Sequence, residues 1–268
     1  MPLVVCATPI GNLEDVTLRV LRELGEADLV LCEDTRRTRT LLDRHGIRAR
    51  LLSYHQHNEA QRVEELLPRL EEGEKVALAS DAGLPGVNDP GARLIGAAIE
   101  RGVEVTVLPG PSAVETALVA SGLLGERYSF VGYLPRGREA LRRLWEDTAS
   151  WDGPVVAFES PKRLPASLRS LAEADPERPV AVCRELTKRF EEVVRGSAEQ
   201  VSARFPEAPK GEITVVFGPS GRGGSVSEQE ALEAVIELVQ AGLPRRRAAD
   251  LVSGLTGLPR NKLYKASL

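Results

Sequence analysis

The sequence lacks the features that mark several large classes of protein. No apolar run approaches the length of a membrane span, and the opening residues MPLVVCATPI carry neither the charged start nor the cleavage site of a signal peptide. There are only three cysteines, each inside an apolar strand-like run, which indicates reduced core thiols and not disulfides. A net charge of −4 excludes a uniformly basic nucleic-acid binder, although local basic patches remain possible. We expect a cytoplasmic globular protein.

Two nucleotide-binding signatures are also missing. TPIGN, at residues 8–12, ends the first expected strand, where a dinucleotide fingerprint would lie, yet Gly11 is its one glycine. The three-glycine pattern that admits a pyrophosphate is absent, and no Walker lysine follows. A nicotinamide oxidoreductase is therefore the least favoured enzyme class, and TPIGN is either a plain turn or part of a site for another ligand.

Strand and helix patterns alternate over the first part of the chain. The runs LVVCAT, ADLVLCE, ARLLSYH, KVALAS and VEVTVLPG predict strands, with helical patterns between them. Gly25 and Gly46 are expected to end the first two helices, and Pro68 to kink or shorten the third. This rhythm is typical of a mostly parallel sheet covered on both faces, and we assign residues 1–109 to an N-terminal α/β lobe.

A second series of strands is predicted by YSFVGYLP, GPVVAFES, RPVAVCREL, EEVVRG and GEITVVFG. EEVVRG follows its predecessor too closely for a helical crossover, so this sheet should contain antiparallel pairs. We assign it to a C-terminal α/β lobe of residues 110–218. The predicted fold class is therefore α/β, with one mostly parallel and one mixed sheet and a ligand cleft where the loops of the two lobes meet.

The end of the chain has a different character. Residues 219–227 predict a Gly/Ser linker, and residues 228–268 a small helical domain. EQEALEAVIELVQ has the period of an amphipathic helix, and GLPR occurs twice, each time with a glycine that can end one helix and a proline that can open the next. We therefore expect three short helices. From Arg245 onward six basic residues stand against one acid, so this domain is a candidate for nucleic-acid contact.

The loop SDAGLPGVNDPG, residues 80–91, combines three glycines, two prolines and two aspartates. It is longer than a simple connection between a strand and a helix needs to be. Glycines let a ligand approach the main chain closely, but Asp81 and Asp89 would repel a phosphate. The loop therefore predicts a site for a neutral or cationic ligand. LPGPSAVETALVASG repeats the theme, because its helix opens with Ser112 and unbonded amides.

Three charged or polar segments hold further candidates. CEDTRRTRTLL places Arg36, Arg37 and Arg39 on one helix, as either a solvated face or an RNA-facing patch. The two histidines of SYHQHNE have no third ligand at suitable spacing, so no metal site is expected. FESPKRL ends a strand with an acid followed by two cations.

Taken together, these segments resemble the tetrapyrrole methylase family of S-adenosylmethionine-dependent methyltransferases, and within it the members that methylate ribosomal RNA. The matching stretches occur in order over nearly all of residues 4–217, which is more specific than any single motif. The tail is similar to the small helix-turn-helix-like appendage of those members. The stretches are ATPIGNLEDVTLRVL, CEDTRRTRTLL, SYHQHNE, ALASDAGLPGVNDPG, VTVLPGPSAVETALVASG, FVGYLP, FESPKRL, RELTKRFEEVVRG and GEITVVF.

The resemblance implies S-adenosylmethionine as the cofactor, folded in the cleft between the lobes. This ligand has a sulfonium and an amino group and no phosphate, which suits a glycine-rich loop that carries carboxylates. The positions that would line its site are Pro9, Gly11, Asp81, Gly83, Ser112, Ala113, Phe158, Ile213 and Thr214.

The implied reaction is methylation of the ribose 2′-hydroxyl of a decoding-centre cytidine in 16S rRNA. A ribose hydroxyl is a poor nucleophile, so a base or a nearby cation should assist it. Glu159, at a strand end beside two cations, is the first choice for the base. The other candidates are Asp34, Glu59 and Glu185 for the base and Arg36, Lys162 and Arg184 for the cation.

The resemblance also implies partners. The substrate is expected to be 16S rRNA within the assembled small ribosomal subunit, and the protein is expected to form a homodimer. The RNA contacts are expected from the basic residues of two regions, namely Arg36, Arg37 and Arg39 in the body and Arg245, Arg246, Arg247 and Lys262 in the tail.

Two other functions stay open. A small-molecule methyltransferase that acts on tetrapyrrole or corrinoid precursors would share the fold, but its substrate offers no phosphate chain for the basic clusters to contact. A non-catalytic regulator would use the α/β body to sense a metabolite and the tail to bind nucleic acid.

Overall fold

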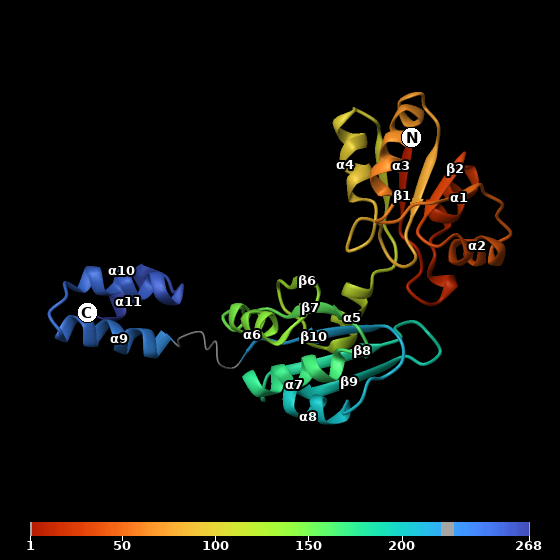
Figure 1. Cartoon of the computed structure of the whole chain (residues 1–268). Helices are drawn as coiled ribbons and strands as arrows, with labels where there is room; N and C mark the ends of the chain where they lie inside the picture. The colour runs from red at the N-terminus through yellow and green to blue at the C-terminus, as the bar shows by residue number, and fades with distance from the viewer. Residues whose placement is uncertain (1, 221–227, 268) are drawn as a thin grey trace.

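The computed structural model describes residues 2–220 and 228–267. Two α/β lobes contact each other, and a small helical domain lies beyond the C-terminal lobe (Figure 1). Each lobe is built on its own five-stranded sheet. Among the described residues, every helix is too short or too polar to span a lipid bilayer.

The strands of the N-terminal sheet are β1 (Leu3–Cys6), β2 (Leu29–Cys32), β3 (Leu51–Ser53), β4 (Val76–Ala79) and β5 (Val105–Leu108). They lie in the order β3-β2-β4-β1-β5, and every neighbouring pair is parallel. The three central strands are buried along their whole length, which explains their continuous apolar sequence. The parallel lobe predicted from the βαβ rhythm is confirmed.

Helices cover both faces of this sheet. They are η1, a 3-10 turn (Leu13–Asp15), α1 (Leu18–Glu26), α2 (Thr35–Arg44), α3 (Glu59–Glu71) and α4 (Ala92–Glu100). Successive strand residues point to opposite faces, so the sheet has two apolar clusters. One joins Leu3 to α3 and α4, and the other joins Val4 to α1 and α2.

Two of the predicted helix boundaries are wrong. Gly25 lies inside α1, because the amide of Ala27 still donates to the carbonyl of Glu23 and closes one more turn. Pro68 does not end α3, whose buried residues Leu66 and Leu70 pack against the sheet on either side of it. Gly46 does follow α2 with a φ of 66°, as predicted.

The C-terminal sheet contains β6 (Ser129–Tyr133), β7 (Val155–Glu159), β8 (Pro179–Arg184), β9 (Glu192–Ser197) and β10 (Ile213–Phe217), in the order β6-β7-β10-β8-β9. Only β6 and β7 pair in parallel, and the other three pairs are antiparallel. The mixed sheet is therefore confirmed. Its helices are α5 (Ala113–Ser121), α6 (Arg138–Asp147), α7 (Leu164–Ala174) and α8 (Ala198–Arg204).

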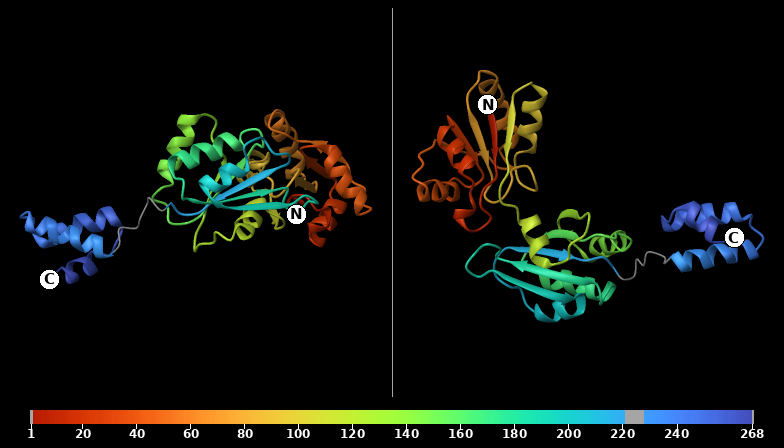
Figure 2. Two further views of the ribbon diagram at one scale, coloured as in Figure 1. Left: turned by 90° about the horizontal axis from the view of Figure 1, so that it is seen from below. Right: turned by 180° about the vertical axis from the view of Figure 1, so that it is seen from behind.

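The helix α5 lies where the two lobes meet (Figures 1 and 2). It follows β5 in the chain but packs on the other sheet, against β7, β8 and β10. On the far face of that sheet, α6 and α7 enclose a core in which the rings of Trp145 and Phe217 meet edge to face, 5.2 Å apart. The predicted lobe boundary at residues 109 and 110 falls just before α5 and remains a proposal.

A buried guanidinium holds the end of the C-terminal lobe. Arg178 is 1% exposed and donates to the carbonyl oxygen of Gly218, at 2.9 Å, and to the hydroxyl of Thr148. The hydroxyl of Ser220 donates to Asp175. The last described residues before the tail are therefore fixed to the lobe. The greater part of the linker predicted at 219–227 lies outside the described residues.

The tail contains three helices, α9 (Glu228–Gln240), α10 (Arg245–Thr256) and α11 (Arg260–Ala266), as predicted. They share a small core of their own, which includes Val235, Val252 and Leu263. Gly257 ends α10 in the left-handed conformation, with a φ of 72°, which explains why the second GLPR begins with glycine.

The three cysteines lie in the cores of the lobes, as their apolar neighbours predicted. Burial raises the pKa of Cys6 to about 12 and that of Cys183 to about 11. Burial also raises the pKa of Cys32. Their thiols therefore remain protonated and unreactive near neutral pH.

Candidate functional site

A cavity of about 910 Å³ lies between the two lobes. The N-terminal lobe lines it with loops that follow β2, β4 and β5, all at the carboxyl edge of the parallel sheet, where ligands of open α/β sheets bind. The C-terminal lobe contributes the ends of β6, β7 and β8 and the start of β10. The predicted cleft is therefore confirmed.

The glycine-rich loop after β4 is fixed to the turn after β1. The amide of Thr8 donates to the carbonyl of Gly83 at 2.8 Å, and the amide of Gly83 donates back to Thr8 at 2.9 Å. The Thr8 hydroxyl also donates to the carbonyl of Ser80. Gly83 has a φ of 79°, which a side chain would disfavour. The loop consequently presents Asp81 in one defined position.

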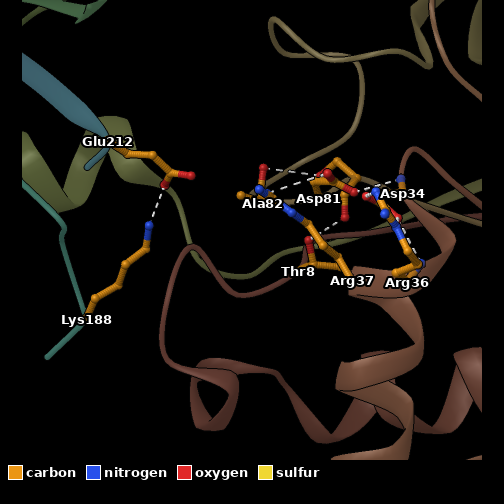
Figure 3. Close-up of polar contacts among 9 residues, drawn as sticks. Thr8, Asp34, Arg36, Arg37, Asp81, Ala82, Lys188 and Glu212 are labelled. Carbon is orange, nitrogen blue, oxygen red and sulfur yellow. Dashed lines mark hydrogen bonds and ion pairs between the residues drawn. The ribbon is translucent and has the colours of Figure 1, made fainter. Parts of the chain in front are cut away.

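Asp81 is held from two sides (Figure 3). Its carboxylate accepts a hydrogen bond from the amide of Asp34 at 2.9 Å and lies 3.5 Å from the guanidinium of Arg37. Arg37, which the sequence placed in an RNA-facing patch, therefore also lines the cavity.

Asp34 is unsuited to act as a base. Its carboxylate caps α2 and forms a two-bonded ion pair with Arg36. These hydrogen bonds lower the pKa of Asp34 to about 2. An acid this strong holds a proton too weakly for general base catalysis near neutral pH.

Two other carboxylates of the same wall are shifted in the opposite direction. Burial, followed by the charges of Glu33 and Asp81, raises the pKa of Asp89 to about 7. Burial and the charge of Asp81 raise the pKa of Glu33. The N-terminal wall therefore brings three carboxylates together with one guanidinium, that of Arg37.

The facing wall is aromatic. The ring of Phe158 lies 5.0 Å from that of Phe130 and 5.6 Å from that of Tyr133, both edge to face. Phe158 stands beside Tyr133 on one neighbouring strand and beside Thr214 on the other. The C-terminal lobe thus offers a flat apolar surface opposite the charged loops.

The structure brings seven of the nine predicted cofactor positions together on the cavity wall. Ser112 is among them, but its hydroxyl donates to Glu115 and does not cap α5. The other two, Pro9 and Gly11, line a smaller neighbouring cavity of about 290 Å³. The seven are Asp81, Gly83, Ser112, Ala113, Phe158, Ile213 and Thr214.

Gly11 makes room for the opposite lobe. A Cβ atom there would lie 2.5 Å from Cγ of Lys188 and 2.8 Å from the carbonyl oxygen of Leu186, both in the β8–β9 hairpin. The amide of Asn12 donates to the hydroxyl of Thr187 at 3.0 Å. Lys188 then continues to Glu212 at 2.8 Å, so this hairpin joins the two lobes (Figure 3).

Glu159, the first choice for the base, is fully engaged. It is 2% exposed and accepts hydrogen bonds from the amide of Ser160 at 2.6 Å and the hydroxyl of Ser167 at 2.5 Å. Its ion-pair partner is Arg163, whereas Lys162 is exposed and does not line the cavity. These contacts favour a structural role for Glu159.

The alternative candidates are engaged as well. Glu59 accepts from the hydroxyl of Tyr54 and the amide of Gly91, so it fixes the far end of the glycine-rich loop. Glu185 pairs with Lys188, and Arg184 pairs with Glu192. Among the described residues, no group of three or more His, Cys, Asp or Glu side chains is placed to hold a metal ion.

The predicted RNA-contacting residues lie on two separate surfaces. In α2, Arg36 is 89% exposed and Arg39 is also exposed. In the tail, α10 opens with Arg245, which is half-buried, and with the exposed Arg246 and Arg247. Lys262, in α11, is exposed too.

Known proteins match the chain along its whole length. The family model of the tetrapyrrole (corrin/porphyrin) methylases matches residues 2–202, and that of the RsmI C-terminal HTH domain matches residues 226–268. Proteins called ribosomal RNA small subunit methyltransferase I are similar to it. The one from Mesorhizobium japonicum is 43% identical, over 99% of this chain and 91% of its own, and the one from Escherichia coli O157:H7 is 39% identical, over 99% and 94%.

Two further matches leave part of the chain uncovered. The protein of the same name from Thermotoga maritima is 45% identical, over 80% of this chain and 97% of its own. Among solved structures, the methyltransferase CobJ has a TM-score of 0.63 at 22% identity, over 81% of this chain and 94% of its own. Uroporphyrin-III C-methyltransferase from Thermus thermophilus, in complex with S-adenosyl homocysteine, has a TM-score of 0.57 at 21% identity, over 81% and 97%. At these identities the structural likeness concerns the fold.

Proposed function

The chain belongs to the tetrapyrrole methylase family and, within it, to the ribosomal RNA small subunit methyltransferase I proteins, and from this premise we propose that it methylates the ribose 2′-hydroxyl of a decoding-centre cytidine in 16S rRNA. The observation that carries the proposal is the extent of the similarity. Relatives of that name match 99% of the chain, tail included, whereas the tetrapyrrole methylase structures match 81%. The substrate is therefore inferred to be RNA and not a tetrapyrrole.

The cleft fits S-adenosylmethionine, the methyl donor of this family. Its volume of about 910 Å³ lies in the usual range for pockets that bind small molecules. The donor is a cation without phosphate, and the charged wall presents Glu33, Asp81 and Asp89 to one arginine. When bound, it supplies a methyl group activated by a positively charged sulfur.

The residues of the chain would hold and align the reactants. Asp81 is fixed by Arg37 and by the amide of Asp34, so its negative charge is already in place for the donor. Ser112 and Ala113 bring the start of α5, with its unbonded amides, to the cavity. Alignment of this kind can supply roughly 7–11 kcal/mol in well-oriented systems.

We propose that the exposed arginines of α2 and the basic start of α10 contact the RNA backbone. Such contacts give affinity without sequence choice and weaken as salt rises. The substrate is proposed to be the assembled small subunit in the cytoplasm.

The proposed function is tested by methyl transfer. Purified protein is incubated with labelled S-adenosylmethionine and either small ribosomal subunits from cells that lack the gene or a precorrin. We expect label in the 16S rRNA, and mass mapping should place it on the ribose of one cytidine. Label in the tetrapyrrole alone would overturn the RNA assignment.

The contribution of the tail is tested by truncation after Ser220, which keeps the contact of Ser220 with Asp175. We expect affinity for the donor product S-adenosylhomocysteine to stay unchanged and the KM for ribosomal subunits to rise. The Thermotoga maritima relative, which matches only 80% of this chain over 97% of its own, suggests that the body alone can be active. An unchanged KM would contradict a role of the tail in RNA contact.

We also propose a homodimer. The described residues leave several apolar side chains exposed, including Val107 on β5 and Val119 on α5, at 51% and 67%. A second copy that covered such residues would remove them from water. Light scattering coupled to gel filtration should give twice the mass of the chain, and the monomer mass would contradict the proposal.

A further inference from the structure

Six carboxylic acids line the cleft, and most of them are already engaged. A base for the 2′-hydroxyl needs a carboxylate that is free to accept a proton. Asp81 is bonded to Asp34 and Arg37, and Glu115 accepts from the hydroxyls of Ser112 and Tyr128. Glu159 and Glu212 are paired with Arg163 and Lys188. The six are Glu33, Asp81, Asp89, Glu115, Glu159 and Glu212.

Glu33 and Asp89 remain, and their surroundings differ. Neither carboxylate has a hydrogen bond or close ion pair with the described residues. The positive charges of Arg37 and His55 act on Glu33 and favour its ionised form. No cation acts on Asp89, whose neighbours are the acids Glu33 and Asp81. Asp89 is therefore the carboxylate of this cleft that gains most from taking up a proton.

Asp89 also faces the place where the two reactants would meet. The preceding residue, Asn88, reaches the opposite lobe, because a Cβ atom on Gly132 would lie 3.0 Å from its side-chain oxygen. The next residue of β6 is Tyr133, whose phenol senses the charge of Asp89. Tyr133 is in register with Phe158, one of the predicted cofactor positions. Asp89 thus looks across the cleft at the predicted cofactor wall.

We propose that Asp89 is the catalytic base that accepts the proton of the ribose 2′-hydroxyl during methyl transfer. This assignment rests on the proposed function. The oxygen lone pair forms the bond to the methyl carbon, the carbon–sulfur bond breaks with its electrons returning to sulfur, and the hydroxyl proton passes to the Asp89 carboxylate. The products are the 2′-O-methyl ribose, S-adenosylhomocysteine and a protonated Asp89, which then loses its proton to water.

The acidic neighbours give this base its strength. An ordinary aspartate is almost fully ionised at neutral pH but is too weak a base to draw a proton from a hydroxyl. The charges of Glu33 and Asp81, together with burial, bring the pKa of Asp89 to about 7. The ionised form then prevails above that pH, so the rate should rise as pH increases through about 7. Tyr133 faces it from β6 and stays neutral there, since burial raises its pKa.

The test compares Asp89→Asn, Glu33→Gln and the control Glu72→Gln, which changes an exposed carboxylate beyond the end of α3. Single-turnover methylation of small subunits is followed against pH, and S-adenosylhomocysteine binding is measured by calorimetry. We expect Asp89→Asn to slow the transfer roughly 10²–10⁴-fold and to bind the product normally. Glu33→Gln should move the rising limb of the profile to lower pH, because a like charge near Asp89 is lost.

A readout without turnover accompanies the kinetics. Carbon-13 spectra of protein labelled at the aspartate carboxyl carbons should show a signal that titrates near pH 7, is absent in Asp89→Asn and moves to lower pH in Glu33→Gln. If Asp89→Asn keeps the wild-type rate, or loses affinity for S-adenosylhomocysteine, Asp89 is not the base. If the wild-type protein methylates no RNA, the proposed function itself fails.

Discussion

The two walls of the cleft differ in chemistry because the two sheets differ in topology. In the N-terminal lobe every strand is parallel, so the loops that follow them converge at one edge and bring Glu33, Asp81 and Asp89 together. In the C-terminal lobe the strands are mixed, and the wall consists of strand residues such as Phe130 and Phe158. One lobe thus supplies charge and the other a flat apolar surface.

The charged wall is tested most severely by Asp81→Asn. Asparagine keeps an acceptor for the amide of Asp34 but removes the charge that faces Arg37. Since hydrogen bonds to charged groups contribute about 1.5–3 kcal/mol, affinity for S-adenosylmethionine should fall roughly 10–100-fold by calorimetry. The pKa of Asp89 should also fall, because Asp81 helps to raise it.

A matched control for this change is Asp43→Asn, in an exposed position of α2 away from the cavity. It should bind the donor like the wild type. Equal losses in the two variants would contradict a specific role of Asp81.

The join between the walls is broken by Gly11→Ala. The new Cβ atom would overlap Lys188 and the main chain at Leu186, which must move away from the N-terminal lobe. Overpacking of this kind costs about 1–3 kcal/mol, so donor affinity should fall about tenfold even though Gly11 lies outside the main cavity.

The control for Gly11→Ala is Gly25→Ala, inside α1, where a Cβ atom would meet only Ile47 at 3.5 Å. Alanine favours a helix over glycine by about 0.5–1 kcal/mol, so this variant should melt at or above the wild-type temperature. Unchanged donor binding in Gly11→Ala would show that the contact between hairpin and turn does not matter for the cleft.

The aromatic wall should be the most tolerant. Phe158→Ala removes the ring that meets Phe130 and Tyr133, and such ring pairs contribute about 0.5–1.5 kcal/mol each. We expect donor affinity to fall severalfold, with the pH dependence of the transfer unchanged because the charged wall is intact. Phe158→Leu, which keeps an apolar side chain, should lose less, and a shifted pH profile would contradict the division of roles between the walls.

Periodic patterns were enough to predict both sheets and the three tail helices. The short spacing before EEVVRG revealed the antiparallel pairs, and the glycine-rich loops marked the cleft. Helix ends were less predictable, since Gly25 and Pro68 are overruled by hydrogen bonding and packing with distant residues.

The chemistry of individual carboxylates was harder to predict. Glu159 stands at a strand end like a catalytic acid, but Arg163 and Ser167 occupy it, and that contact depends on how the chain turns after β7. Asp89 was visible only as part of a loop. Its freedom and its pKa arise from the approach of Glu33 and Asp81, which come from other strands and share no sequence motif with it.

The burial of all three cysteines has a practical consequence for measuring motion. Because their thiols stay protonated inside the lobes, a cysteine placed at an exposed position would be the one that reacts with maleimide dyes under native conditions. One such site at Arg39 and another at Lys262, both exposed, would report the distance between body and tail by energy transfer. The native sequence is thus ready for single-molecule work without removal of its own sulfur.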